Sequence, residues 1–98
     1  MNKKEPSETD TGQQETLLEF PCKFPVKAMG RDEDGFEDLI TGMILSHAEM
    51  YSGESVTTNV SSTGKYLSVT VPVEALSKTQ LDRIYQELTD CERVVMAL

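Results

Sequence analysis

The clearest pattern in the chain is a strict alternation of apolar and polar side chains over residues 66–73. A period of two is typical of a β-strand with one buried face. We expect the buried face to carry Leu67, Val69, Val71 and Val73, and the other face to carry Tyr66, Ser68 and Thr70. One side of this strand must therefore be covered, while the other side can stay open to water or to a partner.

Three weaker alternations predict three more strands. Residues 23–29 place Phe24, Val26 and Ala28 on one face and Lys23, Lys27 and Met29 on the other. Residues 56–60 form a short, polar segment suited to the edge of a sheet. The last segment places Val94, Met96 and Leu98 on one face and Val95 and Ala97 on the other. Because proline lacks an N–H group, we expect regular pairing of the first strand to begin at Val26, or a bulge at Pro25.

Two helices are indicated by apolar side chains at helical spacing. The first has the stripe Phe36, Leu39, Ile40, Met43 and Ile44, and the second has the stripe Leu81, Ile84, Tyr85 and Leu88. Asp34 followed by Glu37, and Ser77 followed by Gln80, have the spacing of capping boxes. We also expect Leu76 and Leu81 to form a hydrophobic staple at the second helix, which should end near Asp90.

The predicted order is strand, helix, strand, strand, helix, strand. Two right-handed strand–helix–strand units interleave into the ferredoxin-like arrangement, a βαββαβ sandwich of the α+β class. In that arrangement the four antiparallel strands have the order 4-1-3-2, and both helices cover the same face. The most apolar strand then lies in the middle of the sheet.

The first sixteen residues differ in composition from the rest. From Asn2 to Thr16 there is no aliphatic or aromatic side chain, so this segment cannot bury enough surface to offset the entropy of ordering it. We expect residues 1–16 to be a disordered acidic and polar tail and residues 17–98 to form a single domain. Leu17, Leu18 and Phe20 should lie along that domain as an apolar strap.

The net charge of −8 argues against nucleic acid or an anionic membrane as the main partner, since both require a concentrated positive field. No apolar run approaches the length of a membrane span. The chain therefore suggests a cytoplasmic protein, in which Cys22 and Cys91 stay reduced.

Several segments spread over about residues 17–98 form a combined pattern: Leu17-Leu-Glu-Phe-Pro21, Phe24, Lys27-x-Met29-Gly30, Ser61-Ser-x-Gly64-x-Tyr66-x-Ser68-Val69, Tyr85-x-Glu87-Leu88 and Val95-Met96-x-Leu98. Together they resemble the YbeD-like family of small, uncharacterised bacterial proteins. The resemblance implies a ferredoxin-like fold close to the ACT-type regulatory domains that bind amino acids and tune enzymes. It transfers no catalytic residue to this chain.

The residues that could carry chemistry favour structural roles. His47 is the only histidine and stands just past the first helix, where we expect a surface or helix-end role. The two cysteines and His47 match no metal-ligand spacing, and the acidic residues 32–38 lack the ligand pattern of a calcium loop. Phosphate-loop and dinucleotide motifs are absent from the sequence. We therefore expect no catalytic activity, no metal and no cofactor.

Two surfaces remain as candidate binding sites. The side of the sheet opposite the helices should present a weakly basic face for a protein partner: Lys23, Lys27, Tyr66, Ser68, Thr70 and Arg93. The loop after the first strand, with Met29, Gly30 and Arg31, is the candidate for a small ligand. The sequence thus predicts a regulatory or interaction module, with a sensor of a small metabolite such as an amino acid as the alternative. We expect a monomer or a weak dimer.

Overall fold

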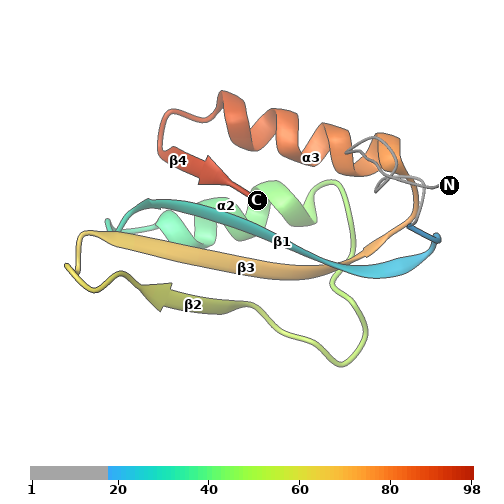
Figure 1. Cartoon of the computed structure of the whole chain (residues 1–98), viewed down its shortest axis with the longest axis horizontal. Coiled ribbons are helices and arrows are strands. Elements are labelled where there is room, and N and C mark those ends of the chain that lie inside the picture. The colour runs from blue at the N-terminus through green and yellow to red at the C-terminus, as the bar shows by residue number, and fades with distance from the viewer. Residues whose placement is uncertain (1–17) are drawn as a thin grey trace, which may run out of the picture.

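Four strands and two helices alternate along the chain in the predicted order (Figure 1). The computed structural model describes residues 18–98, so the expectations for the tail and for Leu17 lie outside the described residues. The elements are β1 (Cys22–Arg31), α2 (Phe36–Leu45), β2 (Thr57–Val60), β3 (Tyr66–Ala75), α3 (Lys78–Asp90) and β4 (Val94–Ala97).

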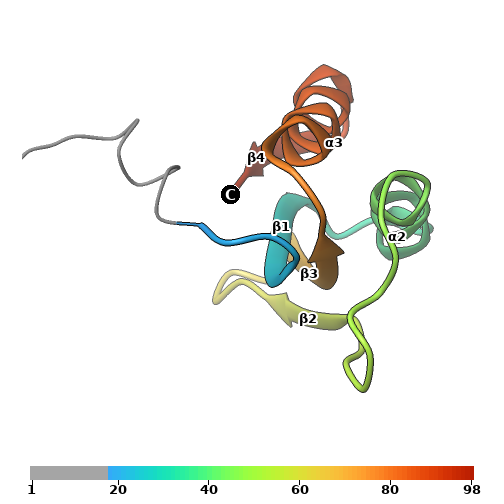
Figure 2. The same ribbon diagram turned by 90° about the vertical axis from the view of Figure 1, so that its right-hand side faces the viewer.

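The strands form one antiparallel sheet of order β2-β3-β1-β4. This is the predicted order 4-1-3-2 read in reverse. Figure 2 shows α2 and α3 on the same side of the sheet, which leaves the other side without a helix. The ferredoxin-like arrangement is therefore confirmed, with the valine-rich β3 as one of the two central strands.

The core lies between the two helices and the sheet. β3 contributes Val69, Val71 and Val73, each with no exposed surface, and β1 contributes Val26 and Ala28. The helices bury the expected stripes, with Phe36, Ile40 and Ile44 from α2 and Leu81, Ile84 and Leu88 from α3. The strand period of two and the helix period of 3.6 thus each predict the residues that meet in this core.

Pro25 does not interrupt the sheet, contrary to expectation. β1 pairs with β3 without a break from Cys22 to Arg31, and Pro25 lies directly opposite Pro72. Lys27 exchanges both main-chain hydrogen bonds with Leu98, at 3.0 and 2.7 Å. Because main-chain groups alternate in direction along a strand, those of Pro25 also point away from β3. The ladder between β1 and β3 therefore needs no N–H from this proline.

The expected faces of the last strand are wrong because β4 contains one extra residue. Met29 pairs with Met96 while Gly30 pairs with Val94, so Val95 is left over at a β-bulge. Val94 and Ala97 consequently both pack on the core. Met96 and Leu98 lie beside Met29 and Lys27 on the side without helices, and they are 48% and 62% exposed.

The two helix starts differ from each other. Ser77 caps α3 as expected, because its Oγ accepts from the N–H of Gln80 at 3.1 Å. Asp34 does not cap α2, whose N-cap is Gly35 in the left-handed region with no side-chain hydrogen bond. The expected staple is also wrong in part, since Leu76 remains 60% exposed beside the buried Leu81.

Candidate functional site

The side of the sheet without helices, called the open face below, carries most of the predicted contact residues. The pairing of β1 with β3 places Lys23 opposite Glu74, Lys27 opposite Thr70, and Met29 opposite Ser68. Tyr66 lies opposite Arg31 at one end of the same pair of strands. Of the six residues predicted for this face, five share it: Lys23, Lys27, Tyr66, Ser68 and Thr70.

Ser68 is less available than expected. It is only 9% exposed, because its small side chain lies at the centre of the sheet between Met29 on β1 and Asn59 on β2. Tyr66 and Thr70 are half-buried. The centre of the open face is therefore closely packed, and larger neighbours must make the contacts there.

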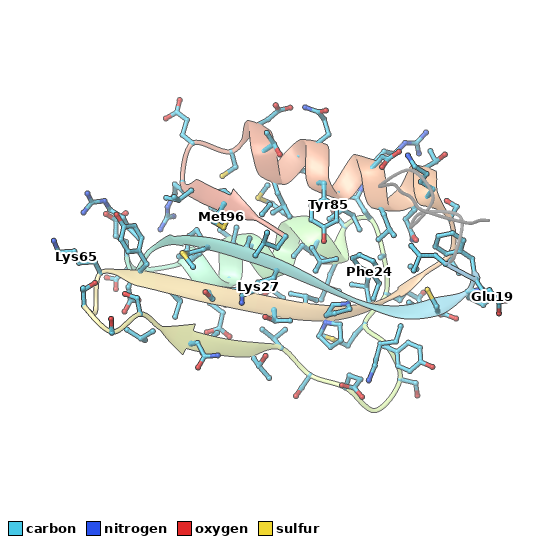
Figure 3. All side chains as sticks on the ribbon, in the orientation of Figure 1. Glu19, Phe24, Lys27, Lys65, Tyr85 and Met96 are labelled. Carbon is cyan, nitrogen blue, oxygen red and sulfur yellow. The ribbon has the colours of Figure 1, made fainter. Side chains whose placement is uncertain are left out.

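Lys27 is the central cation of the open face (Figure 3). Within residues 18–98 its side chain has no hydrogen-bond or ion-pair partner. Lys23, by contrast, contacts Glu54 at 3.2 Å and lies 5.9 Å from the centre of the Tyr51 ring. Beside Lys27 lie the exposed Met96 and Leu98, so the open face combines an unpaired positive charge with apolar surface.

Arg93 does not belong to the open face, which corrects its predicted place. Its guanidinium lies 5.7 Å from the centre of the Phe36 ring and donates to the main-chain oxygen of Asp34 at 3.2 Å. The residue comes just before the β4 bulge, and it contacts the start of α2. The sequence could not reveal this contact, because Asp34 lies 59 positions away.

The predicted ligand loop does not form one cleft. Met29 belongs to the open face, while Gly30 is buried against α2. A Cβ atom on Gly30 would lie 2.5 Å from the Phe36 ring and 2.3 Å from the main-chain oxygen of Arg93. Only Arg31 of the three is exposed. The glycine is thus required for close packing and offers no room to a ligand.

Arg31 instead lines a shallow hollow of about 250 Å³, called the arginine hollow below. Its other residues are Glu33, Glu92, Arg93 and Val95. It therefore offers two guanidinium groups and two carboxylates within one small surface. A separate hollow at the start of α2 is lined by carboxylates and by no basic side chain, from Asp32, Glu33, Asp34, Gly35, Phe36, Glu37, Asp38 and Leu67.

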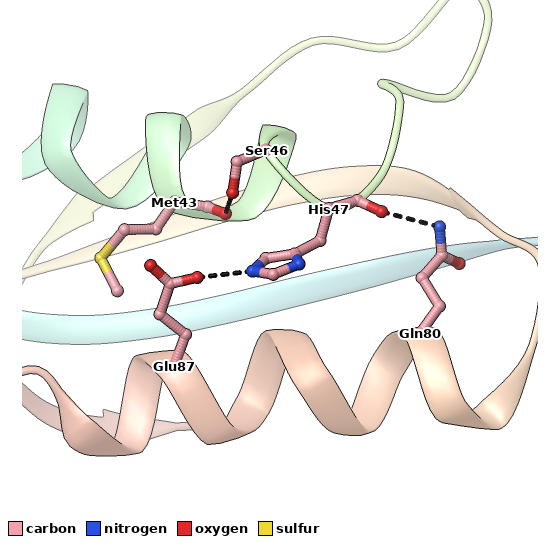
Figure 4. A network of polar contacts seen from close by, with 5 residues as sticks. All are labelled: Met43, Ser46, His47, Gln80 and Glu87. Atoms are coloured by element: carbon pink, nitrogen blue, oxygen red, sulfur yellow. Dashed lines mark hydrogen bonds and ion pairs between the residues drawn. The ribbon is translucent and has the colours of Figure 1, made fainter.

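His47 links the two helices (Figure 4). Its Nε2 lies 2.5 Å from a carboxylate oxygen of Glu87 on α3, and its main-chain oxygen accepts from Nε2 of Gln80 at 2.9 Å. Ser46 caps the end of α2 by donating to the main-chain oxygen of Met43 at 2.7 Å. The sequence predicts a helix-end role for His47, but its partner Glu87 is 40 positions away and was missed.

Tyr85 has the one perturbed acid–base group identified among residues 18–98. Burial raises the pKa of its hydroxyl from 10.0 to about 12, because the charged phenolate loses solvation. The hydroxyl donates to the main-chain oxygen of Leu98 at 2.5 Å, and the ring meets Phe24 edge-on at 6.4 Å between centroids. Leu18 of the expected apolar strap lines a small groove beside these two rings.

Residues 18–98 contain no group of three or more histidine, cysteine, aspartate or glutamate side chains placed to hold a metal ion. Cys22 and Cys91 are both free thiols. Neither α2 nor α3 is long and apolar enough to span a membrane.

Sequence comparison finds uncharacterised relatives over nearly the whole chain. A family described as "Protein of unknown function (DUF493)" matches residues 15–98. A UPF0250 protein of Nitrosomonas europaea is 38% identical over 85 residues, which is 87% of this chain and 98% of the relative. A UPF0250 protein of Chromobacterium violaceum is 41% identical over 86 residues, covering 88% of this chain and 97% of the relative.

Comparison with solved structures supports the fold. The solution structure of protein HP0495 from H. pylori aligns with a TM-score of 0.63 at 14% identity, covering 95% of this chain and 98% of that one. The ACT domain from GTP pyrophosphokinase of Chlorobium tepidum aligns with a TM-score of 0.58 at 15% identity, covering 78% of this chain and 84% of that one. At these identities the likeness is one of fold.

Proposed function

The chain belongs to the DUF493 family of proteins of unknown function, and from that premise we propose that it is a regulatory or interaction module that binds a protein partner without catalysis. The relatives also confirm the YbeD-like resemblance drawn from segments across residues 17–98. The fold of this chain is a further support, since its structural neighbour from Chlorobium tepidum is an ACT domain of a larger enzyme.

The observation that carries this proposal is the composition of the open face. Lys27 stands unpaired at its centre within the described residues, next to Met96 and Leu98, which are 48% and 62% exposed. Apolar side chains left in water beside a positive charge form a surface that a partner can cover. The chain as a whole carries a net charge of −8, so this local cation favours a partner that places an acidic side chain opposite Lys27 and apolar side chains opposite Met96 and Leu98.

The test is capture of partners by the tagged full chain from a lysate of its source organism, followed by mass spectrometry. The variant Lys27→Glu with Met96→Ser should lose the specific partners that the wild-type chain retains. The matched variant Lys65→Glu with Val60→Ser makes the same change of charge and a similar change of polarity away from the open face, and it should retain them. Equal capture by both variants, with unchanged circular dichroism spectra, would reject the open face as the binding surface.

A second candidate function is the binding of an amino acid at the arginine hollow. Arg31 and Arg93 supply two guanidinium groups for a carboxylate, while Glu33 and Glu92 supply two carboxylates for an ammonium group. This pairing of charges suits a zwitterion, and an ACT-like fold is consistent with such a role.

A thermal-shift screen against the common amino acids tests this second function. A ligand present at about a hundred times its Kd stabilises the folded state by about 2.7 kcal/mol, which raises the Tm of a small domain by several degrees. Arg31→Gln with Arg93→Gln should abolish the shift. A screen with no shift would leave the arginine hollow without this role.

A further inference from the structure

A cavity of about 410 Å³ opens where α2 ends and α3 begins, beside the end of β3. This helix-end pocket shares no lining residue with the arginine hollow, and it meets the open face at Glu74, which lies opposite Lys23 near the end of β3. Its volume falls in the lower part of the range seen for small-molecule sites. The residues that matter to the argument are Leu45, His47, Glu49, Glu74, Leu76 and Gln80.

One part of the wall is apolar and exposed. Leu45 is 36% exposed and Leu76 is 60% exposed. Leu76 precedes α3 without packing into the core, so its side chain is available to a ligand. An apolar group lying between these two leucines would remove both of them partly from water, which is favourable.

The other part of the wall is negative. Glu49 and Glu74 come from two segments that are held together by a hydrogen bond from the N–H of Glu74 to the main-chain oxygen of Glu49, at 2.8 Å. Within residues 18–98 neither carboxylate has an ion-pair or hydrogen-bond partner. The last turn of α2 contains no basic residue, and Lys23, which lies across the sheet from Glu74, pairs with Glu54 instead.

The polar donors that could hold an anion in the pocket are already used. His47 donates from Nε2 to Glu87. Gln80 donates from its side chain to the main-chain oxygen of His47, accepts from the N–H of Leu76 at 2.7 Å, and directs its own N–H to Ser77. The helix-end pocket therefore keeps acceptors and negative charge, while the side chains of His47 and Gln80 already have hydrogen-bond partners.

We propose that the helix-end pocket binds a primary ammonium group carried on a short alkyl stem. The ammonium group lies between the carboxylates of Glu49 and Glu74, and the stem lies against Leu45 and Leu76. This ligand chemistry is shared by free alkyl amines and by a lysine side chain. The proposal does not depend on the function proposed above, since it uses none of Lys27, Met96 and Leu98 and no residue of the arginine hollow.

The first experiment is a titration of the ¹⁵N-labelled full chain with 1-pentylammonium, followed by NMR. Saturable shifts are expected at the main-chain amides of residues that line the pocket, such as Glu49, Leu76 and Gln80. Matched titrations with 1-pentanol and pentanoate, which keep the stem and change the charge, should give much weaker effects. Equal binding of all three compounds, or no saturable shift with pentylammonium, would overturn the proposal.

Two variants test separately how the carboxylates and the apolar wall of the pocket contribute to binding. Glu49→Gln with Glu74→Gln keeps the shape of the pocket and should weaken pentylammonium binding by at least about fivefold, since two partly exposed ion pairs are lost. Leu76→Ala should weaken it by a smaller factor. The control Asp32→Asn with Glu37→Gln removes the same charge at the other end of α2 and should bind as the wild type does. Unchanged binding by the first variant would overturn the proposal.

Two further ligands identify the source of the ammonium group. 1,5-Diaminopentane represents free amines, and Nα-acetyl-lysine-N-methylamide represents a lysine within a polypeptide. Tighter binding of the diamine assigns the pocket to a small metabolite, and tighter binding of the lysine derivative assigns it to a partner protein. If neither produces the shifts seen with pentylammonium, the assignment to a biological ammonium ligand is overturned.

Discussion

The hydroxyl of Tyr85 on α3 donates a hydrogen bond to the main-chain oxygen of Leu98, which also accepts from the N–H of Lys27. This contact joins α3 to the end of β4 and to β1. Tyr85→Phe removes only the donor, so it should lower the free energy of unfolding by about 1 kcal/mol. Urea denaturation at pH 7 measures the difference, and an unchanged midpoint would mean that the hydrogen bond contributes nothing.

The same residue makes stability depend on alkaline pH. Burial raises the pKa of Tyr85 in the folded chain to about 12, against 10.0 for an ordinary tyrosine. Below pH 10 the hydroxyl is neutral in both states. Between about pH 10 and 12 the unfolded chain releases its proton first, so the free energy of unfolding falls as the pH rises. Tyr85→Phe should lose less stability over this interval than the wild type, as measured by urea denaturation at each pH.

The two helix starts should respond differently to the loss of a side chain. Ser77→Ala removes the cap of α3 and should cost about 1 kcal/mol. Asp34→Ala should have little effect, because α2 is capped by Gly35 without a side-chain hydrogen bond, and the contact from Arg93 uses the main chain of Asp34. Thermal unfolding of both variants checks this. A larger loss from Asp34→Ala than from Ser77→Ala would contradict the observed caps.

Replacement of two glycines by alanine should change the stability of the chain in opposite directions. Gly30→Ala places a methyl group against the Phe36 ring and the main chain of Arg93, and overpacking of this kind costs about 1–3 kcal/mol. Gly42→Ala lies within α2 with nothing within 4 Å of the added methyl group, so the higher helix propensity of alanine should stabilise the chain by about 1 kcal/mol. Denaturation midpoints that move in opposite directions are the expected result.

The contact between His47 and Glu87 can be measured by a double-mutant cycle. His47→Gln, Glu87→Gln and the double variant should give a coupling energy of no more than about 1 kcal/mol, because the two side chains remain 29% and 46% exposed. Adding salt should reduce this value. A coupling of zero at low salt would show that the contact does not hold α2 and α3 together.

Most of the architecture could be predicted from local patterns. The alternation in β3 and the apolar stripes of the two helices each depend on neighbours a few positions apart, so they survive in the sequence as visible periods. Handedness rules then allow few ways to assemble the elements. The sequence was therefore sufficient to predict the order of the strands, the shared side of the helices and the buried residues of β3.

The composition of the surfaces was harder to predict, because it depends on one extra residue in β4 and on side-chain contacts between residues far apart in the sequence. Val95 at the β4 bulge reverses the direction of every following side chain, which moves Met96 and Leu98 onto the open face. A period of two cannot reveal this extra residue. Arg93 and His47 find their partners 59 and 40 positions away, and such contacts leave no local sign. The strand pairing thus places five of the six predicted residues on the open face, together with apolar residues that the sequence pattern did not indicate.

Pro25 has a consequence for how these molecules behave beside one another in solution. On the outer side of β1, beyond the point where Leu98 pairs with Lys27, this proline offers a carbonyl group and no N–H. An extended segment from a second molecule that paired with this edge of β1 would lack the hydrogen bond that an N–H group at position 25 would donate. The stretch of β1 that β4 does not cover is in this way less suited to the edge-to-edge stacking that leads to fibres.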